Sequence, residues 1–143
     1  MRSRGPLSRL ESRTMRDRRQ SRPAWLPEGI WGGLALGVAV VIFAVLGLTP
    51  SLSWIPEGPL VTIAILVAML GYGLIGFRVR AQTGRLATAS AAAAVAGGIS
   101  GAVGGITYTL FGKSVLNIAV GLTLGAIGGG IIGAVGGLRR TSP

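Results

Sequence analysis

Few residue types in this chain could carry out acid–base, nucleophilic or metal chemistry. The sequence contains no Cys and no His, which excludes disulfides, thiolate nucleophiles, imidazole bases and metal sites built from these ligands. Its four acidic residues are Glu11, Asp17, Glu28 and Glu57, and none of them lies inside a long apolar stretch. Transport and catalysis within a membrane usually need an ionisable group at depth. The sequence therefore predicts that the protein is not an enzyme and holds no cofactor and no metal.

The polar groups within the apolar stretches are hydroxyls and one amide, at Thr62, Tyr72, Ser90, Ser100, Thr107, Tyr108, Thr109, Asn117 and Thr123. In a membrane such hydroxyls usually bond to the backbone of their own helix or to a neighbouring helix. We expect one interhelical hydrogen bond, between Thr109 and Asn117. The Gly-Tyr-Gly sequence at 71–73 lies inside an ordinary apolar stretch, which argues against a selectivity filter because a filter needs a re-entrant loop.

Membrane-crossing helices must position these residues. Half of the 143 residues are apolar and only 13% are charged, and the mean hydropathy is +0.64. Stretches without Asp, Glu, Lys or Arg cover residues 30–48, 59–77, 86–111 and 114–138. At 1.5 Å per residue the two shorter stretches are about 28 Å long, close to the thickness of a bilayer core. The expected fold class is all-α, an integral membrane four-helix bundle, with a basic tail at 1–29, a transmembrane domain at 30–138 and a second tail at 139–143.

Basic residues are distributed unevenly between the two ends of these helices. Thirteen of the fourteen lie in the tails or between the second and third helices, and Lys113 is the exception. Because basic segments stay in the cytoplasm, we expect both termini there, in a bacterial inner membrane rather than an organellar one. The arginines expected to set this topology, or to bind anionic headgroups of the bilayer, are Arg16, Arg18, Arg19, Arg22, Arg78, Arg80, Arg85, Arg139 and Arg140.

The N-terminal segment has two alternative interpretations. Its basic start and apolar stretch are typical of a cleaved signal peptide, but the 19 residues of 30–48 exceed the usual apolar region of a signal. Nucleic-acid binding is not expected, because the tail has no aromatic residue before Trp25 and no recognisable module. We therefore expect a retained cytoplasmic tail.

The spacing of small residues is the strongest pattern in the sequence. Small residues recur every four positions in the third and fourth helices, in the rows Ala89, Ala93, Gly97, Gly101, Gly105 and Gly121, Gly125, Gly129, Gly133, Gly137. If the connection at 111–114 folds these helices back antiparallel, the rows face each other in pairs whose numbers sum to 226. Small residues let helix backbones approach closely, and close packing drives association in lipid. This predicts a tight glycine-zipper hairpin.

Two weaker patterns accompany this row. Gly29, Gly33 and Gly37 form a shorter row in the first helix, and Gly128, Gly130 and Gly136 form a second small face on the fourth. We expect that second face to receive the first helix or another subunit. A Trp-x-Pro-Glu-Gly pattern recurs before the first and second helices, and its tryptophans, Trp25 and Trp54, are expected to anchor at the headgroup level.

With these rows the chain resembles bacterial four-span glycine-zipper membrane proteins, a broad class with many uncharacterised members. The resemblance covers the third and fourth helices best and rests on GxxxG runs, so it implies helix packing rather than an activity. Mitochondrial inner-membrane protein translocases are similar in having four spans with glycine zippers. Their zippers are best known in the earlier spans, so their activity is not carried over to this chain.

These patterns favour a structural or assembly role, in which the protein packs through glycine zippers into a homo-oligomer or a larger membrane complex. The alternative is a small pore-forming or transport protein, such as a channel or a holin-like protein. The lack of charge inside the apolar stretches favours the first interpretation.

Overall fold

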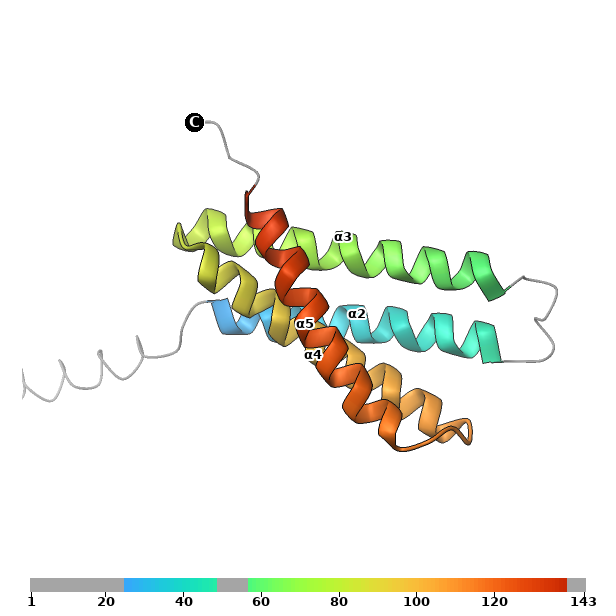
Figure 1. Cartoon of the computed structure of the whole chain (residues 1–143). Coiled ribbons are helices and arrows are strands. Elements are labelled where there is room, and N and C mark those ends of the chain that lie inside the picture. Colours follow the sequence, from blue (N-terminus) through green and yellow to red (C-terminus); the bar gives the residue numbers. More distant parts are fainter. Residues whose placement is uncertain (1–24, 49–56, 139–143) are drawn as a thin grey trace, which may run out of the picture.

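The computed structural model describes residues 25–48 and 57–138, and these residues form four helices (Figure 1). The helices are α2 (Trp25–Leu48), α3 (Glu57–Thr83), α4 (Leu86–Leu110) and α5 (Leu116–Leu138). Each is long and apolar enough to cross a membrane. The expected all-α membrane bundle is confirmed.

Large apolar side chains cover the outside of the bundle, and small ones fill its interior. Trp31, Leu70 and Leu124 are 72%, 67% and 64% exposed, respectively. A surface of this kind would cause aggregation in water but is an ordinary face toward lipid. The fully buried apolar side chains are those of Val79, Ala89, Ala92, Ala93 and Ala96, so the core lies largely along α4.

Helix ends extend beyond the expected apolar stretches. α2 begins at Trp25 rather than at residue 30, and α3 continues to Thr83 rather than ending at 77. Backbone hydrogen bonding continues where the helix leaves the hydrocarbon, because long basic side chains there reach the headgroup region. α3 stops where Gly84 adopts a φ of 69° and donates its amide proton to the carbonyl of Arg80 at 2.7 Å. Glycine adopts this left-handed conformation without strain.

A tight turn at 111–115 joins α4 to α5. Gly112 has a φ of 79°, and the amide of Lys113 donates to the carbonyl of Tyr108 at 3.1 Å. This is the hydrogen-bond pattern of a Schellman cap, which ends a helix and reverses the chain. α5 therefore runs back along α4, and it begins at Leu116 rather than at 114.

The two helical hairpins contact each other unevenly. α4 contacts the other three helices, α3 contacts α2, α4 and α5, and α2 does not contact α5 within the described residues. We call the end of the bundle with the α3–α4 connection the Gly84 end, and the opposite end the Lys113 end. In Figure 1 the α4–α5 hairpin crosses the α2–α3 pair obliquely, and its turn lies away from the ends of α2 and α3.

Candidate functional site

Backbone lies against backbone where α4 meets α5. A Cβ added at Gly97 would overlap the carbonyl oxygen of Gly125, and one at Gly101 would overlap that of Gly121. An ideal Cβ at Gly101 would also lie 3.4 Å from the Cα of Gly125, and one at Gly97 would lie 3.2 Å from the Cα of Gly129. The residue numbers of these last two pairs sum to 226. Glycine alone fits at these levels without separating the helices, and we call this contact the small-residue interface.

Alanine takes the place of glycine on α4 toward the Gly84 end of this interface. The Cα of Ala93 lies 3.6 Å from an ideal Cβ at Gly133, and the Cβ of Ala89 lies 3.4 Å from one at Gly137. Both alanines are fully buried. The two helices therefore remain in close contact as far as the last turn of α5.

The interface shifts at the Lys113 end. A Cβ at Gly105 would meet the backbone of Asn117, whereas one at Gly121 would lie 3.6 Å from the backbone nitrogen of Gly105. The Thr109 hydroxyl donates to the carbonyls of Gly105 at 2.9 Å and Ser114 at 3.4 Å. The expected Thr109–Asn117 hydrogen bond was wrong, because the Thr109 hydroxyl bonds to backbone carbonyls instead.

The glycine row of α2 packs on α4. Ideal Cβ atoms at Gly29 and Gly33 would lie 3.3 and 2.9 Å from the Cα atoms of buried alanines in α4, and one at Gly37 would lie 3.3 Å from the Val103 side chain. The structure thus brings α2 onto a second face of α4. Two of the three glycines again meet backbone.

The second small face of α5 receives α3. A Cβ at Gly76 would overlap the backbone of Gly133, and one at Gly136 would overlap the backbone of Gly73. The expectation that the first helix occupies this face was wrong, since α2 does not contact α5 in the described part of the chain. Gly73 was missed because its spacing in α3 is irregular, and a Cβ at Gly128 would meet nothing within 4 Å.

Two buried hydroxyls form a hydrogen-bonded pair in the core. The oxygens of Tyr72 and Ser100 are 2.7 Å apart, and Ser100 also bonds to the carbonyl of Gly97 at 3.2 Å. The single Ser100 proton goes to that carbonyl, so Tyr72 is the donor in the pair. Nearby, the Ser90 hydroxyl donates across the hairpin to the carbonyl of Gly130 at 2.9 Å.

Basic side chains in the described residues divide between the two ends. Arg78 and Arg85 are exposed at the Gly84 end. Arg80 is half-buried there, with its Cδ 3.4 Å from an ideal Cβ at Gly137 and a buried Nη1 that has no hydrogen-bond partner among the described residues. Lys113 lies at the opposite end and is exposed.

Several expected sites fall partly or wholly outside the described residues. Trp25 is half-buried at the start of α2 and packs against the buried core. Trp54 and the arginines of the two tails, Arg16, Arg18, Arg19, Arg22, Arg139 and Arg140, lie outside the described residues. Within 25–48 and 57–138 no three His, Cys, Asp or Glu residues gather where they could hold a metal ion.

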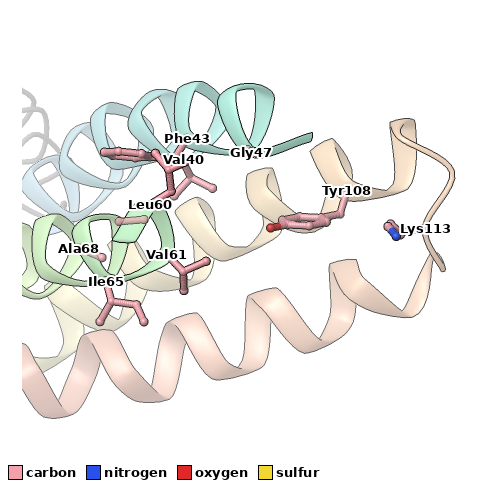
Figure 2. Close-up of a pocket in the computed structure, with 11 residues that line it drawn as sticks. Val40, Phe43, Gly47, Leu60, Val61, Ile65, Ala68, Tyr108 and Lys113 are labelled. Carbon is pink, nitrogen blue, oxygen red and sulfur yellow. The ribbon is translucent and has the colours of Figure 1, made fainter. Parts of the chain in front are cut away.

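Comparison with protein-family models, curated proteins and solved structures finds no match to this chain. Function must therefore be argued from the geometry of the helices, and two apolar grooves remain on their surface. The lateral groove, of about 470 Å³, runs over α4 and α5 and is lined by Ser90, Ala126, Ile127, Gly130, Ile131, Ala134, Val135 and Leu138. The Lys113 groove, of about 480 Å³, lies between α2, α3 and the end of α4 (Figure 2).

Proposed function

We propose that this membrane protein has a structural role and assembles into a homo-oligomer or a larger membrane complex through the lateral groove. The observation that carries the proposal is a set of small residues on the floor of the groove that the chain leaves uncovered. Ideal Cβ atoms at Gly98 and Gly130 would lie 3.6 Å from the Cβ of Ala126 and 3.4 Å from that of Ala94. Small residues of α4 and α5 thus lie side by side on the surface.

The small-residue interface itself is not free for this purpose. Its glycines are covered by the facing helix of the same chain, so a partner must use another surface. The lateral groove has one raised wall, formed by Ile127, Ile131 and Val135, which are 56%, 62% and 60% exposed. A helix that lies along this wall can bring its backbone close to the small residues beside it, which favours association in lipid.

A second copy of the chain is the partner that we favour. Two copies related by a two-fold axis would present the same groove to each other, and each wall could pack over the other floor. A different membrane subunit with a small-residue helix would use the same surface. The two cases differ in whether the purified chain associates alone.

Filling the groove tests this proposal. Ala134→Leu should lower dimer formation in lipid nanodiscs or vesicles by about tenfold, the effect of about 1.4 kcal/mol of lost packing. Ala35→Leu, at an exposed position on α2, is the matched control. The measurement is the oligomer distribution from crosslinking across a range of protein-to-lipid ratios, with thermal unfolding showing that each variant folds.

Three outcomes can be told apart. Loss of the oligomer with Ala134→Leu alone supports a homo-oligomer. A purified chain that stays monomeric but crosslinks through Ile131 to a different protein in native membranes supports the larger complex. Association that Ala134→Leu leaves unchanged would sink the proposal that the lateral groove is the contact.

A pore is the weaker candidate. The helices meet through alanine side chains, glycine backbones and the Tyr72–Ser100 pair, so one chain offers water little polar surface between its helices. A pore would have to form between subunits. Flux of ions or a small dye from proteoliposomes, measured beside the oligomer distribution, separates the two functions.

We also propose that both termini lie in the cytoplasm of a bacterial cell, in its inner membrane. Arg78, Arg80 and Arg85 lie at the Gly84 end, whereas Lys113 is at the other, which supports this orientation. Exposed Gln82 and Ser114 mark the two ends. With cysteine introduced at one position at a time, an impermeant maleimide should label position 114 but not 82 in intact cells, and the reverse pattern would overturn the orientation.

A further inference from the structure

The Lys113 groove is apolar along its walls and polar at one end. Figure 2 shows Val40 and Phe43 of α2 on one side, Leu60 and Val61 of α3 on the other, and the charged residue beyond them. α2 lines it from Val40 to Gly47, about 10 Å at 1.5 Å per residue. A leaflet contributes about 15 Å of hydrocarbon, so the groove spans much of one leaflet.

The groove exists because the two hairpins diverge toward this end. α3 packs on α5 near Gly73 and Gly76, and the first part of α3 lines the groove instead. Water does not fill an apolar space at this depth, because it would find few polar partners there. Hydrocarbon is the natural filling.

Two free donors stand at the polar end of the groove. The Lys113 ammonium and the Tyr108 hydroxyl, both exposed, have no hydrogen bond or ion pair with any other described residue. Lys113 immediately follows Gly112, so the turn holds its backbone at the boundary between helix and headgroups. A lysine at this level directs its ammonium toward the headgroups, where phosphate is the available anion.

We propose that the Lys113 groove holds one phospholipid of the adjacent leaflet. An acyl chain lies between α2 and α3, and the headgroup phosphate pairs with the Lys113 ammonium and accepts a hydrogen bond from Tyr108. The apolar walls account for the chain, and the single cation with its neighbouring hydroxyl accounts for the phosphate. This inference is independent of assembly through the lateral groove.

Photochemical capture tests the proposal on the full chain in vesicles of phosphatidylethanolamine and phosphatidylglycerol. A photoreactive amino acid replaces Val61, which is 54% exposed and lines the groove. Irradiation should give an adduct whose mass is the chain plus one phospholipid. Lys113→Gln should lower the yield about fivefold, as expected for losing one lysine–headgroup interaction, and Ala64→Phe should lower it by filling the groove.

Matched controls separate a bound lipid from the lipid that surrounds any membrane helix. The same photoreactive residue at Leu124, exposed on α5, should give adducts whose yield does not depend on Lys113. Arg85→Gln removes one exposed positive charge at the opposite end and should leave the Val61 adduct unchanged. Equal sensitivity of the two positions to Lys113→Gln, no sensitivity at either, or a Val61 adduct with a second protein copy would each overturn the proposal. The lateral-groove variants test assembly separately.

Discussion

The two hairpins use glycine in opposite ways. Between α4 and α5 a glycine faces the backbone of the other helix, as Gly101 faces the carbonyl of Gly121. Between α2 and α3 a glycine faces the flexible end of a side chain, and an ideal Cβ at Gly71 would lie 2.6 Å from Cδ2 of Leu36. The first arrangement permits no side chain on either helix. The second provides a socket that a rotamer change can enlarge.

This difference explains the shape of the bundle. Backbone contact must recur at every level, so it holds α4 and α5 together along nearly their whole length. Side-chain contact tolerates variation, so α2 and α3 can diverge from the other hairpin and leave the Lys113 groove open. Glycine content by itself therefore says little about rigidity, because what the missing side chain would have met decides it.

The sharpest test replaces a glycine that faces backbone. Gly101→Leu and Gly125→Leu should each lower the free energy of unfolding in micelles by about 1 to 3 kcal/mol, since overpacking must separate the two helices. Gly128→Leu on the same helix is the control, because a Cβ there meets nothing within 4 Å. Unfolding titrations measure the difference. Similar losses for Gly125→Leu and Gly128→Leu would remove the basis of the comparison.

A disulfide can trap the α4–α5 contact at its edge. The Cβ of Ala126 lies 3.6 Å from an ideal Cβ at Gly98, within the 3.5–4.5 Å that a disulfide needs. Gly98→Cys with Ala126→Cys should therefore oxidise within one chain. Because the chain has no native cysteine, mass spectrometry after alkylation reports only this pair. Val103→Cys with Ala126→Cys should not react, since Val103 faces Gly37 of α2.

A glycine that faces a side chain should tolerate substitution. Gly71→Ala requires Leu36 to change rotamer, and the higher helix propensity of Ala, by up to about 1 kcal/mol, offsets that cost. We expect a stability within about 1 kcal/mol of the original. Gly101→Ala, measured in the same titration, should be clearly more destabilising. If the two alanine variants lose equal stability, the distinction between backbone and side-chain contacts is wrong.

The smallest effect is expected at the buried hydroxyl pair. Tyr72→Phe removes the donor to Ser100, and such bonds within membranes contribute about 0.6 kcal/mol. The Ser100 hydroxyl keeps its bond to the Gly97 carbonyl, so no donor is left unpaired. Thermal unfolding should show a small decrease. A loss as large as that of Gly101→Leu would mean that this pair, rather than backbone contact, holds the helices together.

The sequence by itself determines that four helices cross the membrane and that α4 and α5 can pair closely. Long stretches without charge indicate the helices, and the four-residue spacing of small residues places them on one face of each helix. The pairing of Gly101 with Gly125 follows once a short turn makes the helices antiparallel, because few registers align two such rows. Helix ends were less predictable, since α3 continues as a helix through Arg78 and Arg80 into the headgroup region.

Only the tertiary structure decided which helix occupies the second face of α5. The sequence offered the glycines of α2, yet α3 takes that face through Gly73 and Gly76 while α2 packs on α4. In water, polarity distinguishes a buried face from an exposed one, but within a membrane both are apolar. Several small faces are then equally acceptable to lipid, and their mutual fit selects among them. The Lys113 groove likewise arises from the angle between the two hairpins, which depends on contacts between residues distant in sequence.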